Sequence, residues 1–435
     1  MHENRQKVRQ ALIIGVLIKD ESLDVLQKDL EELTRLLQTL DIKTCGSFIQ
    51  SRETQDARTL IGSGKVEEIR QAATEGGIDL IVFDSDLSPT QARNLEKDLG
   101  IEVTDRTGVI LQIFSQNART HEAKLQIELA GLEYALPRLK RQWTHLSRTR
   151  GGRGFIGGDG ETQLEVDKRY IRTKIQQVKS KLDKIKSQRS TQKKLRQSFF
   201  SVAIVGYTNS GKSTLLNRLT ASDVLVEDKL FATLDPSTRI IKPDEKPAIL
   251  FSDTVGFIKK LPHSLVASFR STFEEILDSD LLIHVVDVSD SDYKARMEDT
   301  ISVLKELNLD KIPRLLCFNK VDKKKDTPVQ IKMIQSVYPA SVMISASKQT
   351  GIEILRKRVY EFFSKQMTER QIRVCFGSEA LLESLYALTR VLHTQYEEES
   401  ISVHFRGASR DVNFVLDQLR KDGALLEDKS IPICL

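Results

Sequence analysis

The sequence predicts a multidomain α/β protein that ends in a smaller α+β domain. Short apolar runs alternate with stretches of helical periodicity over most of the chain, which is typical of mostly parallel sheets flanked by helices. The 435 residues and the hydrophobic content of 40% are enough for two to four cores. We expect four regions: an N-terminal α/β domain over 8–117, a helical hairpin over 118–197, a second α/β domain over 198–365 and the small α+β domain over 370–435.

Strands and helices alternate in the N-terminal region. We expect strands at 11–18, 45–50 and 80–83, and helices at 23–40, 65–73 and 88–99. The segment Gly62-Ser63-Gly64-Lys65 resembles part of a phosphate-binding loop. Thr59 replaces the first glycine of that pattern and Val66 replaces its Ser or Thr, which favours a plain glycine turn into a helix.

Two heptad patterns predict a helical hairpin in the second region. The apolar positions of the first helix are Leu125, Leu129, Leu132, Leu136 and Leu139, and those of the second are Leu164, Ile171, Ile175, Val178, Leu182 and Ile185. Their spacing of three and four residues lets the two seams pack against one another. The joining segment Arg148–Gly160 is rich in glycine and arginine, so we expect an interaction loop.

Positive charge is concentrated in this hairpin. Residues 138–197 contain 18 Lys or Arg and 5 Asp or Glu, a net charge of +13, whereas the whole chain carries +5. A charged helix is usually only a solvated face, but an excess this local indicates a binder of polyanions. We favour RNA over DNA, because Trp143, His145 and Phe155 can stack on bases and no zinc-finger or recognition-helix pattern is present. The candidate RNA-binding residues are Arg148, Arg150, Arg153, Lys168 and Arg169.

The third region contains a phosphate-binding loop. An apolar run ends in Gly206, and Gly211, Lys212 and Ser213 complete the pattern G-x-x-x-x-G-K-S before a helix. The glycines let backbone N–H groups point at phosphate oxygens, the lysine neutralises the β- and γ-phosphates, and the serine can ligate Mg²⁺. An ordinary strand-to-helix turn is the alternative, but the strand and helix on either side make a chance match improbable.

Three downstream motifs select the nucleotide. Asp253-Thr254-Val255-Gly256 is a D-x-x-G, in which the Asp reaches Mg²⁺ and the Gly N–H reaches the γ-phosphate. Asn319-Lys320-Val321-Asp322 is an N-K-x-D, whose final carboxylate can accept from N1–H and the 2-amino group of guanine. The backbone of Ser345-Ala346-Ser347 can hold the guanine O6. Each motif is weak alone, but their order along the chain predicts a GTP site.

A switch threonine is expected between the first two motifs. Thr233, in Phe231-Ala232-Thr233-Leu234-Asp235-Pro236, is the candidate, with Thr238 and Thr220 as alternatives. The predicted Mg²⁺ ligands are Ser213, Thr233 and Asp253, and the predicted catalytic residues are Lys212, Thr233 and Gly256. The residues predicted to bind GTP are Gly206, Tyr207, Thr208, Asn209, Ser210, Gly211, Lys212, Ser213, Thr214, Phe231, Ala232, Thr233, Asp253, Thr254, Val255, Gly256, Asn319, Lys320, Asp322, Ser345, Ala346 and Ser347.

The group that orients the attacking water is left open. Phe257 follows the D-x-x-G, where other GTPases place a Gln, and a phenyl ring cannot orient water. One alternative is a K⁺ ion held by Asn209, whose surrounding pattern resembles that of potassium-dependent GTPases; the other is that Asn209 only shapes the loop. His263 is a further candidate, against a packing or solvated role.

Composition favours a reducing, cytoplasmic environment. The four cysteines are scattered without a C-x-x-C pair, which argues against disulfides and zinc. The apolar run at 11–18 is short and is followed by charged residues, so a strand is expected there rather than a signal peptide, and no stretch is long enough to span a membrane. In the tail we expect strands at 372–376 and 401–405 and helices at 379–393 and 411–421.

The chain resembles the HflX family of translational GTPases. The resemblance rests on Leu60–Ile69, Arg141–Leu146, Gly160–Arg169 and Phe231–Pro236, and it covers about residues 10–365. It implies GTP hydrolysis stimulated by the large ribosomal subunit and a role in splitting or rescuing stalled ribosomes under stress. The residues Phe155–Gly158 make the glycine-rich loop longer than the family pattern, so contacts at the loop tip are the least transferable feature.

Together, the residues and the resemblance predict a monomeric, Mg²⁺-dependent GTP switch whose partners are GTP or GDP, the large ribosomal subunit and its RNA. Two other hypotheses stand beside it. One is an RNA-binding ribosome-assembly factor or RNA chaperone in which GTP only times release. The other is ATP-driven RNA remodelling through the N-terminal domain, which would depend on Lys65.

Overall fold

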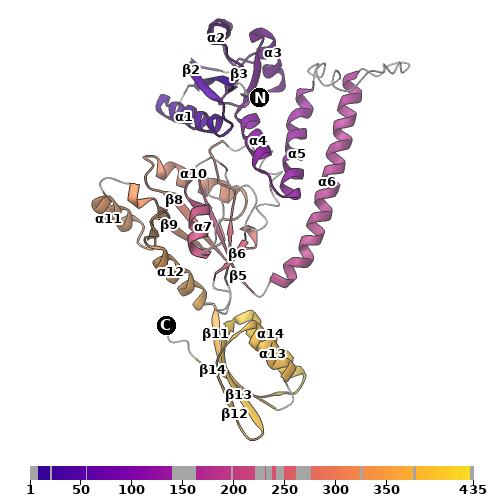
Figure 1. Cartoon of the computed structure of the whole chain (residues 1–435), viewed down its shortest axis with the longest axis vertical. Helices are drawn as coiled ribbons and strands as arrows, with labels where there is room; N and C mark the ends of the chain where they lie inside the picture. The colour runs from indigo at the N-terminus through magenta and orange to yellow at the C-terminus, as the bar shows by residue number, and fades with distance from the viewer. Residues whose placement is uncertain are drawn as a thin grey trace, which may run out of the picture. The chain divides into compact units, whose positions relative to one another are not determined.

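The computed structural model describes residues 8–19, 22–54, 56–139, 163–196, 199–220, 231, 238–241, 249–260, 276–323, 327–375 and 379–431. These residues fall into two compact units, each described by itself. The first contains the residues up to Ser187 together with Phe231 and Lys260, and the second contains the others. The described strands form three sheets (Figure 1). The first two are mostly parallel, as the sequence predicted, and the third, in the tail, is antiparallel.

The N-terminal domain is a four-stranded parallel sheet with the strand order β2-β1-β3-β4. The chain alternates strictly between strand and helix here, as expected, and Ser88 caps its helix through a capping box with Gln91. The elements are β1 (Gln10–Ile18), α1 (Leu23–Thr39), β2 (Lys43–Arg52), α2 (Ser63–Gly76), β3 (Leu80–Phe83), α3 (Pro89–Leu99), β4 (Glu102–Asp105) and α4 (Arg106–Asn117).

The predicted hairpin is present as α5 (His121–Ala135), the short 3-10 helix η1 (Leu136–Arg138) and α6 (Gln163–Arg196). Figure 1 shows α5 and α6 side by side, and the two heptad seams form one apolar cluster. Two ion pairs, Lys174–Glu128 at 2.8 Å and Lys179–Glu133 at 2.9 Å, connect the helices along this seam. Because these paired side chains are partly exposed, they add little stability, and packing of the leucines of α5 against the isoleucines and valine of α6 contributes most.

The nucleotide domain contains a six-stranded sheet with the order β10-β9-β8-β5-β7-β6. Five strands are parallel and β6 runs antiparallel to β7. The carboxyl ends of the parallel strands meet at one edge, which brings the four predicted motifs together. The elements are β5 (Phe200–Gly206), α7 (Lys212–Thr220), β6 (Thr238–Ile241), β7 (Ile249–Asp253), β8 (Leu281–Asp287), α10 (Tyr293–Glu306), β9 (Arg314–Asn319), η3 (Val321–Lys323), α11 (Thr327–Val337), β10 (Val342–Met343) and α12 (Ile352–Ser364).

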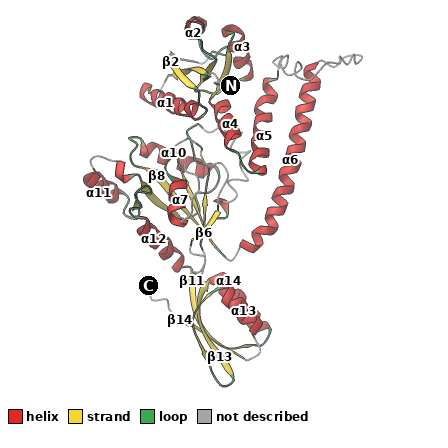
Figure 2. Cartoon of the chain, in the orientation of Figure 1, coloured by secondary structure: helices red, strands yellow, loops and turns green. Residues whose placement is uncertain are grey.

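The tail is an antiparallel four-stranded sheet with the order β12-β13-β11-β14, and Figure 2 shows its two helices beside one face. Ile401, Val403 and Phe405 form the buried face, as predicted, and pack with α14. The arginine side chain of Arg410 donates to the backbone oxygen of Phe199 at 2.6 Å, which connects the tail to the nucleotide domain. The elements are β11 (Met367–Cys375), α13 (Glu379–Leu388), β12 (Arg390–Tyr396), β13 (Ser400–Ala408), α14 (Ser409–Lys421) and β14 (Leu425–Ile431).

One predicted tail element was wrong in its second half. The helix expected over 379–393 ends at Leu388, and Arg390–Tyr396 instead forms strand β12 against β13. The backbone N–H and the side-chain hydroxyl of Thr389 both bond to the oxygen of Leu385, which closes the helix. The strand forms because its backbone groups gain partners in β13, a long-range pairing that local periodicity does not reveal.

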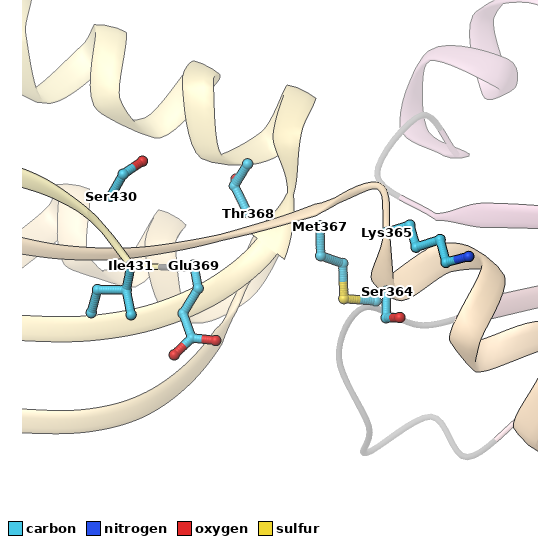
Figure 3. A pocket seen from close by; sticks show the side chains of 7 residues that line it. All are labelled: Ser364, Lys365, Met367, Thr368, Glu369, Ser430 and Ile431. Atoms are coloured by element: carbon cyan, nitrogen blue, oxygen red, sulfur yellow. The ribbon is translucent and has the colours of Figure 1, made fainter. Parts of the chain in front are cut away.

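A small pocket lies where α12 ends and β11 begins (Figure 3). It is lined by Ser364, Lys365, Met367, Thr368, Glu369, Ser430 and Ile431. None of these residues belongs to the motifs predicted to bind GTP. Within the described part of the chain, no helix combines the length and the apolar character needed to cross a membrane.

Candidate GTP-binding site

The phosphate loop joins β5 to α7 and depends on its two glycines. A Cβ at Gly206 would lie 2.3 Å from the backbone oxygen of Val285, and a Cβ at Gly211 would lie 2.3 Å from Nδ2 of Asn319. Both glycines also have positive φ angles, which side chains rarely adopt. Among the described residues, the buried hydroxyls of Thr208 and Ser210 have no hydrogen-bond partner, so the loop offers polar atoms to a ligand.

Lys212 is the first residue of α7 and its ammonium is buried. Its Nζ donates to the backbone oxygen of Tyr207 at 2.9 Å. Burial lowers the pKa of Lys212 to about 8; the nearby Asp253 opposes this effect and Lys320 adds to it. A buried ammonium is costly without an anionic neighbour, so the position fits a bound phosphate group.

Two predicted Mg²⁺ ligands meet in the structure. The hydroxyl of Ser213 donates to Oδ2 of Asp253 at 2.5 Å, although the residues come from α7 and from the end of β7. A hydroxyl and a carboxylate oxygen at one point are hard ligands of the kind that Mg²⁺ prefers, so the donor set fits that ion. The third predicted ligand, Thr233, and its neighbour Ala232 lie outside the described residues.

The N-K-x-D motif follows β9 and touches the phosphate loop. Asn319 donates from Nδ2 to the backbone oxygen of Ser210 at 2.8 Å and accepts at Oδ1 from the N–H of Ala346 at 3.0 Å. The ammonium of Lys320 donates to the backbone oxygen of Asn209 at 2.7 Å. The base-reading segments and the phosphate loop are therefore parts of one hydrogen-bonded unit.

Asp322 is held as a carboxylate that can accept from a base. The hydroxyl of Ser345 donates to its Oδ1 at 2.6 Å, and the hydroxyl of Ser347 lies 3.4 Å from its Oδ2. The Ser345 hydrogen bond is the main reason that the pKa of Asp322 is lowered. An ionised carboxylate only accepts hydrogen bonds, which matches the donors on N1 and the 2-amino group of guanine.

The D-x-x-G segment lies directly on the phosphate loop. The N–H of Thr208 donates to the backbone oxygen of Phe257 at 2.7 Å, and the N–H of Phe257 donates to the oxygen of Gly206 at 3.1 Å. A Cβ at Gly256 would lie 2.8 Å from the backbone Cα of Thr208, so a side chain there would force the two segments apart. Phe257 is buried and has no polar side-chain atom, so it cannot orient water.

The structure adds one residue to the predicted site. Asp287, at the end of β8, pairs with Lys320 at 2.8 Å and so holds the lysine of N-K-x-D. Its signal in the sequence was the same as for the other motifs, a polar residue that ends an apolar run. The side chain of Thr254, from the D-x-x-G, instead donates to the backbone oxygen of Ile204 at 2.7 Å and ties β7 to β5.

Several predicted residues are not part of these contacts. Phe231 is buried in the first unit, where it packs edge-on against Phe114 and its backbone oxygen accepts from Asn117 at 2.9 Å. Lys168 and Arg169 lie on α6. The loop arginines Arg148, Arg150 and Arg153 and the candidate His263 are outside the described residues.

The segment of the N-terminal domain that resembles part of a phosphate-binding loop forms a turn at the start of α2. Gly62 is the N-cap of α2, and its N–H donates to the side chain of Gln50 at 2.9 Å. Lys65 pairs with Glu68 at 2.6 Å on the same helix. The plain interpretation of this segment, a glycine turn that starts a helix, agrees with these contacts.

The six-stranded sheet and the four assembled motifs define a P-loop GTPase. Models of three family regions match the chain: "GTP-binding GTPase N-terminal" over 27–115, "GTP-binding GTPase Middle Region" over 117–196 and "50S ribosome-binding GTPase" over 201–320. The chain is 39% identical to the GTPase HflX of Escherichia coli, covering 91% of this chain and 92% of that protein. It is 38% identical to the GTPase HflX of Gluconacetobacter diazotrophicus, covering 91% and 94%. The chain belongs to the HflX family of GTPases and hydrolyses GTP.

Solved structures are similar as well. A GTP-binding protein from Sulfolobus solfataricus in complex with GDP aligns with 25% identity and a TM-score of 0.43, over 82% of this chain and 99% of that chain. The crystal structure of SsGBP with GDP aligns with 25% identity and a TM-score of 0.47 over the same shares.

Proposed function

We propose that this protein is a GTP-hydrolysing switch that binds the large ribosomal subunit through its basic hairpin and acts in ribosome splitting or rescue under stress. The main support for this proposal is the positive charge of α6. This helix has twelve Lys or Arg and three Asp or Glu over Gln163–Arg196. The match of the nucleotide domain to the model of a 50S ribosome-binding GTPase supports the same partner.

The distribution of charge on α6 favours a polyanion over a protein partner. The apolar residues Ile171, Ile175 and Val178 are buried against α5. Basic residues on the rest of the helix are exposed: Arg169, Arg172, Lys179, Lys181, Lys184 and Lys186. A helix that presents so many cations can displace the counterions of several phosphates at once, which gives strong, salt-dependent affinity for RNA.

The site explains why such a partner would control hydrolysis. The chain supplies phosphate-binding amides, the ammonium of Lys212 and the oxygens of Ser213 and Asp253, which together would hold the triphosphate and a Mg²⁺ ion that neutralises its charge. At the position after the D-x-x-G, where a side chain could orient the attacking water, the chain has the buried Phe257, which cannot do so. A docked partner that orders or completes the site can raise hydrolysis by ~10³–10⁵.

The test is GTP hydrolysis with and without purified large ribosomal subunits. Two variants are compared with the wild type: a chain with the Arg148–Gly160 loop shortened, and an Arg172→Glu/Lys181→Glu double variant on the exposed face of α6. Strong stimulation of the wild type that falls in both variants, and that weakens steeply with salt, supports the proposal. An Arg358→Glu variant on α12 is the control for a general effect of charge and should keep full stimulation.

If no ribosomal particle stimulates GTP hydrolysis, the proposed partner is contradicted. The assignment of the protein as a GTPase would still stand. Splitting is separated from assembly by sedimentation of intact 70S ribosomes with the protein and a GTP analogue. Conversion of 70S particles to subunits supports splitting or rescue. Binding only to immature large subunits, with 70S particles left whole, supports the assembly factor instead.

A further inference from the structure

One side chain of the phosphate loop reaches the segment that follows the D-x-x-G. Tyr207, directly after Gly206, is only 6% exposed, and its hydroxyl accepts a hydrogen bond from the N–H of Lys259 at 2.9 Å. Lys259 stands three residues beyond Gly256. Both partners belong to the same compact unit as the four GTP motifs. The contact is therefore internal to the nucleotide domain, and it uses a side chain from which only phosphate-binding backbone was expected.

The hydroxyl of Tyr207 adds a third hydrogen bond to two that the backbone makes. The N–H of Thr208 donates to the oxygen of Phe257 at 2.7 Å, and the N–H of Phe257 donates to the oxygen of Gly206 at 3.1 Å. Almost any residue can make those two bonds, because they use main-chain atoms only. The third requires a long, rigid side chain that ends in an acceptor, which is what a tyrosine supplies.

The ring of Tyr207 is held from the side of α10. The guanidinium carbon of Arg296 lies 5.0 Å from the centre of the ring, and Arg296 also pairs with Asp290 at 2.5 Å. A guanidinium over the face of an aromatic ring is attracted by the negative face of that ring, more so where water is partly excluded. The side chains of Arg296 and Asp290 are 26% and 16% exposed. The ring, and with it the hydroxyl, is therefore fixed in place.

The position of Lys259 matters because Gly256 is so near to it in the chain. In P-loop GTPases the γ-phosphate is contacted by the lysine of the loop and by the N–H of the D-x-x-G glycine. A Cβ on Gly256 would lie 2.8 Å from Cα of Thr208 and 2.9 Å from Nζ of Lys212, so this glycine lies beside both groups. Two residues separate Gly256 from Lys259, too few to let one move far without the other. A displacement of about 1 Å in such a donor can cost about a hundredfold in rate.

We propose that Tyr207 is a positioning residue through which the site distinguishes GTP from GDP. Its hydroxyl holds Lys259, and this contact keeps the N–H of Gly256 where it can donate to the γ-phosphate. Arg296 contributes by holding the ring. GDP has no γ-phosphate for Gly256 to contact, so loss of the hydroxyl weakens the binding of GTP and leaves that of GDP unchanged. The inference rests on GTP hydrolysis by this domain and not on ribosome binding.

The test measures dissociation constants for GDP and for a non-hydrolysable GTP analogue with Mg²⁺, by calorimetry on the full chain without ribosomes. Tyr207→Phe removes only the hydroxyl. Its affinity for the GTP analogue should fall about fivefold or more, while its affinity for GDP stays within about twofold of the wild type. Single-turnover hydrolysis at saturating GTP should also slow. Arg296→Met should act in the same direction, and the double variant should add little, because both changes act through one hydroxyl.

Tyr338→Phe is the matched control. It removes the hydroxyl of another half-buried tyrosine of the same domain, whose ring packs on Phe318, and it should leave both affinities unchanged. Thermal unfolding shows whether each variant is folded, and Arg296→Met decides the question if Tyr207→Phe is not.

Two results would overturn the proposal. Equal weakening of GDP and of the GTP analogue would mean that Tyr207 only shapes the phosphate loop. An unchanged ratio of the two affinities in the folded variants, or an equal change in Tyr338→Phe, would mean that the hydroxyl of Tyr207 positions nothing. These measurements do not involve ribosomal particles, so the role of Tyr207 and the proposed partner can fail separately.

Discussion

Asn319 donates a hydrogen bond from Nδ2 to the backbone oxygen of Ser210, across 109 residues of sequence, at a distance of 2.8 Å. Its Oδ1 accepts from the N–H of Ala346, so one side chain connects three of the four GTP motifs. Because Gly211 leaves no room for a Cβ beside Asn319, this contact also explains the second glycine of the phosphate loop.

Asn319→Ala should therefore weaken GTP and GDP alike. It removes two buried hydrogen bonds and leaves their partners unsatisfied, a cost of about 1–3 kcal/mol for each such group. We expect affinity for both nucleotides to fall at least about tenfold and the melting temperature to drop. Calorimetry and thermal unfolding measure the two effects. Asn413→Ala, at an exposed position on α14, is the control, and equal nucleotide affinities in both variants would contradict the role of Asn319.

Asp322→Asn should change the base that is recognised. The carboxylate accepts from guanine, whereas an amide can also donate, as xanthine requires. We expect binding of GTP to weaken by about a hundredfold and binding of xanthosine triphosphate to strengthen. Competition with a fluorescent nucleotide measures both. Ser347→Ala, which leaves the shorter Ser345 contact in place, should have a much smaller effect. If Asp322→Asn still prefers GTP over xanthosine triphosphate as strongly as the wild type does, Asp322 does not recognise the base.

Hydrolysis should depend on K⁺ if Asn209 holds this ion. Asn209 has a φ of 57°, and its backbone oxygen is held by Lys320. Replacing K⁺ by Na⁺ at constant ionic strength should slow hydrolysis several-fold in the wild type, and Asn209→Ser should lose the difference between the two ions. Phosphate release under single-turnover conditions is the measurement. Equal rates in K⁺ and Na⁺ for the wild type would leave Asn209 with a role in loop shape only.

Acid should destabilise the nucleotide domain through His284. This residue lies in the central strand β8, and burial, helped by the charges of Arg314 and Lys212, lowers its pKa to about 3. The unfolded chain takes up a proton near pH 6.5, so stability falls as pH decreases below that value. Between pH 7 and pH 5 the loss from this group is about 2 kcal/mol.

Denaturant unfolding of His284→Leu at both pH values measures that loss, since leucine does not titrate. We expect the variant to lose about 2 kcal/mol less than the wild type between pH 7 and pH 5. His393→Leu, at an exposed position on β12, should behave as the wild type does. An identical pH dependence in His284→Leu and the wild type would show that other groups dominate acid sensitivity.

The motifs of the GTP site were predictable because their chemistry is local. Two glycines with special backbone angles and a lysine at a helix start lie within nine residues, Gly206–Thr214, directly after an apolar strand. The meeting of the motifs also followed, because parallel strands bring their carboxyl ends to one edge. The helix–strand boundary near Thr389 was missed, because strand β12 exists only through its pairing with β13.

The sequence by itself thus determined the fold class and predicted the residues that would bind guanine nucleotide, since both depend on periodicity or on short-range backbone chemistry. Only the tertiary structure decided which charges meet. Lys260 and Asp84 are 176 residues apart in the sequence, much farther than the residues of a single motif. Neither residue has a sequence neighbourhood that marks it as the partner of the other. Their pairing arises because folding buries acidic side chains of the N-terminal domain, and a buried carboxylate is stable only where a cation is brought to it.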